Sequence, residues 1–330
     1  MTASLPLPLL RQLQGAKAEE AWAALASHAL DACDTAGAGL AADAAARLRD
    51  EALRALDAWL AGAGWDLWAA FDTALPRTAD RLVAWWDAIP QGSGAAVLIL
   101  DGLSLRELPL LRRGAEDHGF AVHAVEATGA ELPGDTNAFA RALGVPARNA
   151  LADGKAPAGF RFAGARTEVA DLPWPDCAGL VKAEPRWVFW HEWPDSRFHS
   201  GGTFQAMAKS AAGTFADADF WAFARRLATG RRLLVTSDHG YAHLGSFHDA
   251  EGEAKAWLRE TFGGSRTAPD GETGPWSPPV VLSLGGRQGR VRLPLGRRKW
   301  PVPGGSPSLA HGGLTLLEAL SPLVELRPQV

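Results

Sequence analysis

The sequence predicts an α/β fold with a mostly parallel sheet covered by helices on both faces, preceded by a helical region. Short apolar runs alternate with helical stretches from about residue 95 onward. Continuous apolar strands separated by helices are typical of a parallel sheet that is buried on both faces. Before that point, residues 16–89 place apolar side chains at the three- and four-residue spacing of amphipathic helices.

The boundary between the two regions is predicted at residues 90–94, where a Pro-Gln-Gly-Ser-Gly run ends the helical periodicity. We therefore expect a helical region over residues 1–94 and an α/β domain over residues 95–330. A chain of 330 residues is long enough for one sizeable domain with an appendage.

The elements of the second region follow from its apolar runs and turn residues. Buried strands are predicted at residues 95–100, 121–125, 187–190 and 233–236. Helices are predicted at residues 105–118, 220–227 and 314–320, the last ending before Pro322. The Gly- and Pro-rich residues 263–279 are expected to form a loop.

Composition and charge limit the functional classes. A net charge of -4 and a pI of about 6.1 give no overall attraction to nucleic acid or to an anionic membrane. Cys33 and Cys177 stand in unrelated contexts and form neither a disulfide framework nor a thiolate zinc site, which favours a reducing compartment. With no signal-peptide pattern and no apolar run of about 18 residues, a cytoplasmic protein without membrane contact is expected.

Metal-binding side chains directly follow two of the predicted strands. Asp101 follows residues 95–100, and Asp238 and His239 follow residues 233–236. In an open parallel sheet, ligands gather beyond the carboxyl ends of the strands. Gly240 permits a sharp turn that directs both Asp238 and His239 to one centre.

Two further segments supply similar side chains. Asp195 and His199 stand four residues apart after the third strand, so in a helix they share one face. His311 lies in a glycine-flanked turn ahead of the last predicted helix. Because zinc accepts both imidazole nitrogen and carboxylate oxygen, these Asp and His residues suit two zinc ions better than one.

The order of these segments resembles that of the PglZ-domain family of the alkaline phosphatase superfamily. The matching segments are residues 97–103 (VLILDGL), 132–136 (LPGDT), 194–199 (PDSRFH), 236–240 (TSDHG) and 311–313 (HGG). The resemblance implies an alkaline-phosphatase-like fold. Where Gly134 stands, the family tends toward a serine, which is a departure at the segment that carries Thr136.

The resemblance also implies roles for the individual residues. One zinc ion would be surrounded by Asp101, Thr136, Asp238 and His239, and the other would be held by Asp195, His199 and His311. Thr136 would be the nucleophile, and Mn²⁺ is a candidate substitute for zinc. The alternative for Thr136 is a simple cap of a helix over residues 138–143, with Arg141 as a surface residue rather than a substrate contact.

The function implied is a two-metal phosphoester hydrolase, acting as a phosphodiesterase on nucleotides or oligonucleotides. The resemblance favours a role in bacterial antiphage defence or signalling and admits a protein partner from a defence complex. The alternatives are a phosphomonoesterase of the same superfamily and a metal-stabilised, non-catalytic scaffold that recruits a partner protein. A sulfatase is disfavoured because neither cysteine lies in a C-x-P-x-R context. A phosphosugar mutase is disfavoured because residues 101–195 are too few for its extra domain.

Other polar residues have two interpretations each. His191 is either a substrate contact beside the metals or a histidine packed among tryptophans. His239 and His243 have the spacing of a helical zinc motif, but no Glu follows His239 as zincin chemistry requires. The basic residues of the stretch 287–299 are Arg287, Arg290, Arg292, Arg297, Arg298 and Lys299. On a β-hairpin they would form either a positive face for a nucleic acid backbone, with Arg297 and Arg298 as substrate contacts, or a solvated surface.

Overall fold

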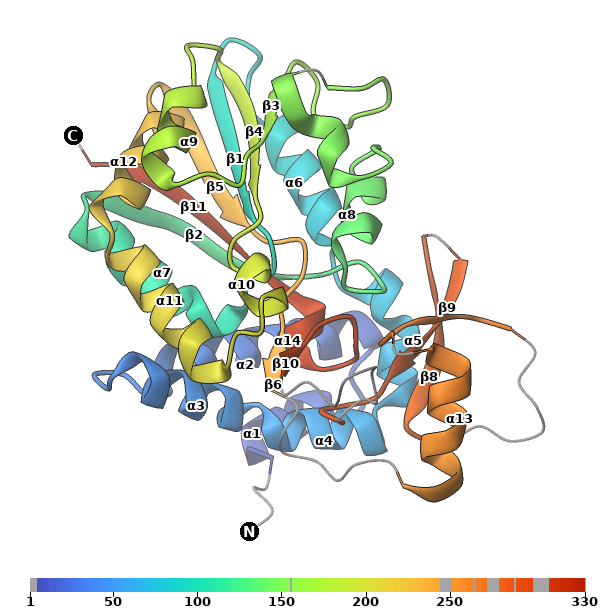
Figure 1. The fold of residues 1–330 in the computed structure, drawn as a ribbon. Coiled ribbons are helices and arrows are strands. Elements are labelled where there is room, and N and C mark those ends of the chain that lie inside the picture. Colours follow the sequence, from blue (N-terminus) through green and yellow to red (C-terminus); the bar gives the residue numbers. More distant parts are fainter. Residues whose placement is uncertain are drawn as a thin grey trace.

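A six-stranded sheet with the strand order β2-β11-β5-β1-β4-β3 forms the centre of the protein (Figure 1). The computed structural model describes residues 5–154, 156–243, 251–263, 265–271, 279–287, 289–298 and 309–329. The strands of this sheet are β1 (Gly94–Leu100), β2 (Phe120–Gly129), β3 (Arg166–Val169), β4 (Arg186–His191), β5 (Arg231–Thr236) and β11 (Leu320–Pro328).

The sheet is mostly parallel, as the sequence predicts. β1 pairs in parallel with both β4 and β5, and β3 pairs in parallel with β4. β11 runs antiparallel to its two neighbours, β5 and β2. All four predicted strands are present, and β3 and β11 are additional to them.

The prediction of a helix over residues 314–320 is confirmed in part, because residues 316–319 are helical but Leu320 already belongs to β11. The helix there, α14 (Leu316–Ala319), is a single turn, and β11 begins at Leu320 directly after it. Pro322 therefore lies within a strand, where it pairs with Ala127 of β2. β11 pairs with a strand on each side, and this pairing begins directly where α14 ends, which is a tertiary effect that a residue pattern does not report.

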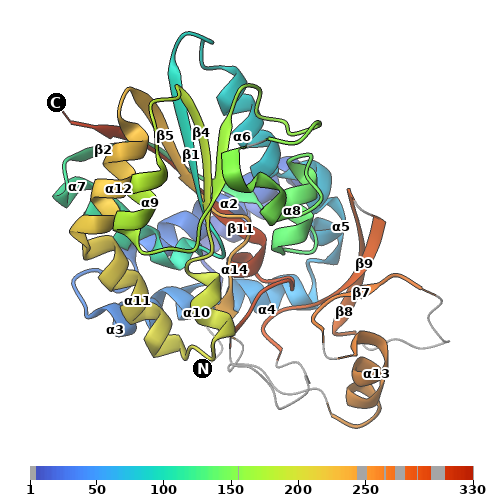
Figure 2. The same cartoon turned by 45° about the horizontal axis from the view of Figure 1, so that its top comes forward.

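Helices cover both faces of the sheet (Figure 2). One face packs against α7 (Leu108–Asp117), α9 (Trp174–Leu180), α11 (Phe204–Ala216) and α12 (Ala218–Ala228). The other face packs against α6 (Thr78–Asp87) and α8 (Thr136–Ala142). Leu98 points to the first group and Val97 to the second, so β1 is buried on both sides, which explains its continuous apolar sequence.

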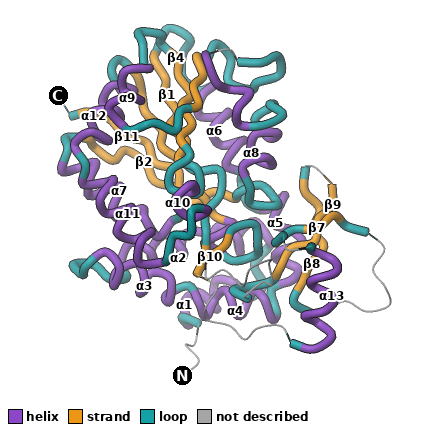
Figure 3. Tube along the Cα trace, viewed as in Figure 1, coloured by secondary structure: helices purple, strands orange, loops and turns teal. Residues whose placement is uncertain are grey.

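The N-terminal helices lie beside the lower end of the sheet in the view of Figure 3. They are α1 (Leu7–Leu13), α2 (Ala18–Thr35), α3 (Ala42–Ala52), α4 (Arg54–Gly62) and α5 (Trp65–Ala74). The periodicity over residues 16–89 predicts α2 to α5, and α1 lies before it. Trp22 and Phe71 belong to the same hydrophobic cluster as Leu314 and Leu317. The two predicted regions therefore share part of one core.

Small elements complete the described chain. They are η1 (Leu105–Glu107), η2 (Arg148–Gly154), α10 (Asp195–His199), β6 (Ala242–His243), α13 (Gly252–Phe262), β7 (Ala268–Pro269), β8 (Val281–Gly286), β9 (Gly289–Pro294) and β10 (Leu309–Ala310). β8 and β9 form the predicted hairpin, with β7 on its other edge. Among the described helices, none is both long enough and apolar enough to cross a membrane.

Candidate metal centre

The carboxyl ends of three neighbouring strands bring the candidate ligands together. β1 lies between β4 and β5, and Leu100 of β1 is in register with His191 of β4. Asp101 follows β1, the Asp238 segment follows β5, and α10 begins shortly after β4. The main-chain nitrogen of Asp195 donates to the main-chain oxygen of Asp101 at 2.9 Å, which ties α10 to the end of β1.

Two glycines permit this convergence. A Cβ atom on Gly240 would lie 2.1 Å from the main-chain oxygen of Leu317, so only glycine fits between the ligand loop and α14. Gly102 has a φ of 76°, and its nitrogen donates to Oδ1 of Asp238 at 2.9 Å. The turn after β1 thereby orients a carboxylate that belongs to the neighbouring strand.

The first ligand group consists of Asp101, Asp238 and His239, whose ligand atoms all lie within 4.8 Å of one another. All three residues are buried. The hydroxyl of Thr136 donates to both carboxylate oxygens of Asp101, at 3.2 and 3.3 Å. Thr136 is half-buried at the start of α8, so the sequence-based candidate nucleophile lies at the edge of this group.

The second ligand group adjoins the first. Ligand atoms of Asp195, His239 and His311 lie within 4.8 Å of one another, so His239 belongs to both groups. His199 Nε2 is 3.1 Å from Asp195 Oδ2, across the helical spacing that the sequence predicts. The rings of His239 and His311 stack with their centroids 4.3 Å apart.

Hydrogen bonds to main-chain oxygens fix the direction of two imidazoles. His239 Nδ1 contacts the oxygen of Gly240 at 3.1 Å, and His311 Nδ1 contacts the oxygen of Gly134 at 3.0 Å. A carbonyl oxygen accepts a hydrogen bond only from a ring nitrogen that carries a proton. In the neutral form of each ring, Nε2 therefore has the lone pair, and this atom faces the carboxylates. Nε2 of His239 and Oδ2 of Asp238 are buried and have no hydrogen-bond partner among the described residues. These two atoms fit ligands of a metal ion.

Burial and mutual repulsion perturb the titration of the carboxylates. Burial, and then the negative charges of Asp238 and Asp195, raise the pKa of Asp101 well above its ordinary value. For Asp195, burial acts to raise the pKa, but the hydrogen bond with His199 and the nearby imidazoles outweigh it, so that pKa lies below its ordinary value. A bound cation would relieve the repulsion among these carboxylates. The donor set and its charge therefore fit divalent metal ions in two adjoining positions.

The second group also contains an imidazole that stays neutral. Burial, and then the proximity of His239, lower the pKa of His311 to about 4. A neutral imidazole is the form that binds a metal ion. His311 is thus poised as a ligand throughout the neutral pH range.

Glu318 of α14 supports both ligand loops, and the sequence-based analysis of the site misses it. Its buried carboxylate accepts from the nitrogen of Gly313 at 3.0 Å and from Arg266 at 2.8 Å. Its main-chain oxygen accepts from the nitrogen of Gly240 at 3.3 Å. The available signal is the Thr-x-x-Glu pattern ending at Glu318, which is typical of a helix start; Thr315 caps α14.

Arg148 and Trp190 hold the outer side of Asp101. Trp190 Nε1 donates to Asp101 Oδ2 at 3.2 Å, and Arg148 Nε lies 3.9 Å from the same oxygen. Arg148 is itself paired with Asp171. No local pattern marks Arg148, because η2 reaches the site only through the tertiary fold.

His191 is packed rather than directed at a substrate. Its Nδ1 accepts from the nitrogen of Trp193 at 3.0 Å, and its Nε2 donates to the oxygen of Leu172 at 3.0 Å. Burial lowers the pKa of this imidazole. Since both ring nitrogens are engaged, His191 has none left for a substrate. Arg141 lies exposed on α8, five residues after Thr136.

Of the two interpretations of the stretch 287–299, the ion pairs of its described arginines oppose a positive face for a nucleic acid backbone. Arg297 is fully buried and pairs with Asp50 and with Asp57, the latter at 2.7 Å. Arg298 is half-buried, and Lys299 lies outside the described residues. The remaining arginines pair with carboxylates: Arg287 with Asp80 and Glu131, and Arg290 and Arg292 with Asp270.

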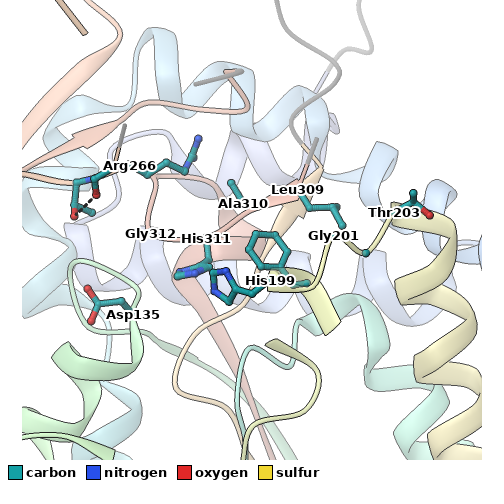
Figure 4. Close-up of a pocket in the computed structure, with 13 residues that line it drawn as sticks. Asp135, His199, Gly201, Thr203, Arg266, Leu309, Ala310, His311 and Gly312 are labelled. Atoms are coloured by element: carbon teal, nitrogen blue, oxygen red, sulfur yellow. Dashed lines mark hydrogen bonds between the residues drawn. The ribbon is translucent and has the colours of Figure 1, made fainter. Parts of the chain in front are cut away.

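A cavity of about 690 Å³ adjoins the second ligand group. Figure 4 shows His199 and His311 next to each other in its wall, with Asp135 and Arg266 to one side of them and Thr203 to the other. A molecule bound at the candidate metal centre would therefore have room beside it.

No family model matches this chain, and no curated protein matches it. Among solved structures, the chain is similar to murine ectonucleotide pyrophosphatase/phosphodiesterase 5, here an inactive variant in complex with AMP. The identity is 14%, the match covers 71% of this chain and 88% of that chain, and the TM-score is 0.48. A second structure of the murine protein, at 14% identity, has a TM-score of 0.47, and the human protein, at 10% identity, has one of 0.41, with the same coverages. At these values the similarities assign neither a family nor an activity.

Proposed function

We propose that this chain is a metal-dependent phosphoester hydrolase of the alkaline phosphatase superfamily, with a two-ion centre. One observation carries the proposal: two adjoining groups of buried or half-buried Asp and His residues share His239, and a threonine hydroxyl is hydrogen-bonded to one of their carboxylates. This arrangement would combine a nucleophile with positions for two cations, as enzymes with two-metal sites do for in-line displacement at phosphorus.

The proposed ligand sets extend the two groups: Thr136 is added to the first, His199 to the second, and His239 is assigned to the first. Asp101, Thr136, Asp238 and His239 would hold one ion, and Asp195, His199 and His311 would hold the other. Zinc suits this imidazole and carboxylate set, with manganese as a substitute. When bound, the ions would neutralise the phosphoryl oxygens and favour the ionised form of the threonine hydroxyl.

Thr136 would carry the phosphoryl group. Its Oγ1 would attack phosphorus while the bond from phosphorus to the ester oxygen breaks, and the leaving group departs as an alcohol or phenol after gaining a proton. Water would then cleave the phosphothreonine and restore the hydroxyl. Asp101 holds the threonine hydroxyl in place, and Trp190 in turn holds Asp101.

The proposed substrate is a phosphodiester of the nucleotide class, as the resemblance to the PglZ-domain family implies. A cytoplasmic site of action, a role in bacterial antiphage defence or signalling, and a protein partner there belong to the same proposal. They rest on the sequence resemblance alone.

The test is an activity assay of the purified full chain with bis(p-nitrophenyl) phosphate and p-nitrophenyl phosphate. Zinc, manganese and a chelator are compared. Activity is expected with either metal and not with chelator. Thr136→Ala should lower kcat by more than about a thousandfold, the order of effect seen when a covalent nucleophile is removed. Thr73→Ala, a change of an exposed threonine on α5, is the matched control.

Two results would contradict the proposal. Thr136→Ala with wild-type kcat would remove the threonine from the mechanism. A metal-loaded protein that is inactive on every phosphoester would instead favour the non-catalytic scaffold, in which the ions only stabilise the fold.

A further inference from the structure

The cavity beside the second ligand group has a largely uncharged wall. Its volume of about 690 Å³ is within the range of pockets that hold small organic ligands. Phe198 supplies accessible apolar surface, and the almost fully buried Leu309 and Ala310 also line the cavity. The Phe198 ring centroid lies 5.6 Å from that of His311. Since His199 and His311 belong to the same wall, a phosphoester bound at the ligand groups would extend one arm into this cavity (Figure 4).

Apart from the two imidazoles, the charged side chains among the described lining residues are Asp135 and Arg266, and each has a structural role. Arg266 is mostly buried and donates to Glu318 at 2.8 Å and to the oxygen of Arg298 at 3.3 Å. Asp135 accepts from the nitrogen of Ala138 at 2.7 Å as the cap of α8. With the cation engaged and an acidic group in the wall, an anionic arm such as a second phosphate is disfavoured.

The nearby basic hairpin does not supply the free cations that the cavity wall lacks. A nucleic acid strand is bound through cations that contact successive phosphates. Arg287, Arg290 and Arg292 of the described hairpin pair with carboxylates, and Arg297 is buried behind it. The described arginines of the hairpin are therefore engaged in ion pairs rather than available to bind successive phosphates.

We infer that this cavity binds an uncharged aromatic or apolar arm of a small phosphoester, so that the substrate is a small molecule rather than a nucleic acid strand. The inference rests on the proposed phosphoester hydrolysis and narrows its substrate class. Burial of the arm against Phe198 supplies affinity, and the ligand groups hold the phosphoryl end.

Equilibrium binding to the zinc-loaded full chain tests the inference apart from turnover. The probes for isothermal titration are methylphosphonate, 1-naphthylmethylphosphonate and decathymidylate, and the carbon–phosphorus bond of the first two resists hydrolysis. The naphthyl probe is expected to bind at least about tenfold more tightly than methylphosphonate, because it buries apolar surface in the cavity. Decathymidylate is expected to bind no more tightly than methylphosphonate.

A variant that fills the cavity provides the second arm of the experiment. Thr267 lines the cavity and supplies none of the proposed metal ligands. Thr267→Trp should abolish the advantage of the naphthyl probe while methylphosphonate affinity stays within about twofold. Thr229→Trp is the matched control, because Thr229 is exposed just before β5, at the opposite end of that strand from the ligands. It should leave both affinities unchanged.

The binding results distinguish a small phosphoester with an apolar arm from a nucleic acid strand as the substrate. Equal affinity of the wild-type chain for the two phosphonates would overturn the inference, even if Thr267→Trp failed to fold. Tighter, strongly salt-dependent binding of decathymidylate would overturn it in favour of a nucleic acid substrate. Absence of all phosphonate binding would contradict the proposed phosphoryl site itself, and the inference would fall with it.

Discussion

Three buried or half-buried carboxylates, Asp101, Asp195 and Asp238, lie close together where the sheet strands end. The burial of Asp101 and its repulsion by Asp238 raise the pKa of Asp101, so this cluster opposes folding of the metal-free chain. The same charges attract cations. A single carboxylate can therefore destabilise the protein without metal and stabilise it with metal.

Asp238→Asn should change stability in opposite directions under these two conditions. In chelator, removal of one charge should raise the free energy of unfolding by about 1 kcal/mol, since one pKa unit corresponds to about 1.4 kcal/mol. In zinc, the variant should be less stable than the wild type, because it loses the stabilisation that a bound ligand provides. Thermal unfolding in chelator and in zinc measures both effects.

Asp31→Asn, a change of an exposed aspartate on α2, serves as the control and should show neither effect. A change of the same sign for Asp238→Asn in chelator and in zinc would exclude Asp238 as a metal ligand.

At the scale of elements, β11 stabilises the sheet through Glu325 as well as through strand pairing. The carboxylate accepts from Arg232 at 2.8 and 2.9 Å, from Arg327 at 3.0 and 3.1 Å, and from Trp85 at 3.1 Å. Burial acts to raise the pKa of Glu325, but these hydrogen bonds outweigh it and lower the pKa to about 2. The ion pairs link β11 to its neighbour β5.

Glu325→Gln should lower the free energy of unfolding by about 1–2 kcal/mol at pH 7, a value discounted because both arginines are partly exposed. A carboxyl whose pKa is lower in the folded state stabilises the protein above its unfolded pKa, and that contribution disappears as pH falls. The difference between wild type and variant should thus shrink between about pH 4.5 and 2. Urea unfolding over this pH range measures the difference in free energy of unfolding. A difference that stays constant with pH would contradict the stabilising role of the ion pairs. Glu116→Gln, at an exposed glutamate, is the control.

The single turn α14 positions both ligand loops through Glu318. Glu318→Gln retains an oxygen acceptor but removes the charge that Arg266 neutralises. Zinc affinity, measured by chelator competition, should fall by about tenfold or more, as is usual when a group that orients metal ligands is changed. An unchanged affinity with lowered thermal stability would show that Glu318 only supports the fold.

At the scale of the whole molecule, buried ion pairs join the N-terminal helices to the C-terminal part of the chain. Asp57 of α4 pairs with Arg297 at 2.7 Å and accepts from the nitrogen of Leu316 at 2.8 Å. Asp50 of α3 pairs with Arg106 at 2.7 Å and also with Arg297. These contacts lie next to α14, so the N-terminal helices brace the element that supports the ligand loops.

Asp57→Ala should lower the free energy of unfolding by about 3–5 kcal/mol, because it weakens the compensation of a buried arginine charge. The double variant Asp57→Ala, Arg297→Met should be destabilised by less than the sum of the single variants, since the uncompensated charge is removed with its partner. Denaturant unfolding of the single and double variants measures the coupling. If the two single variants had additive effects on the free energy of unfolding, Asp57 and Arg297 would not couple the N-terminal helices to the C-terminal part of the chain.

Local patterns in the sequence determined the buried strands and the side chains that follow them. β1 and β5 are recognisable because a strand buried on both faces is continuously apolar, and Asp101 and Asp238 stand one and two residues after these strands. The Asp195 and His199 spacing predicts their shared helical face because the two residues lie one turn apart. These features depend on neighbours in the chain, so the chain alone reports them.

Only the tertiary structure decided how distant residues meet. β11 pairs on both sides, so the chain changes from helix to strand at Leu320, the last residue of the predicted helix. Arg297 became a buried ion-pair partner of Asp57 instead of a surface cation, and the two residues are 240 positions apart. Glu318 and Arg148 reach the candidate metal centre in the same way. A charge pattern shows that an arginine is present, but burial and the choice of partner depend on packing across the whole fold.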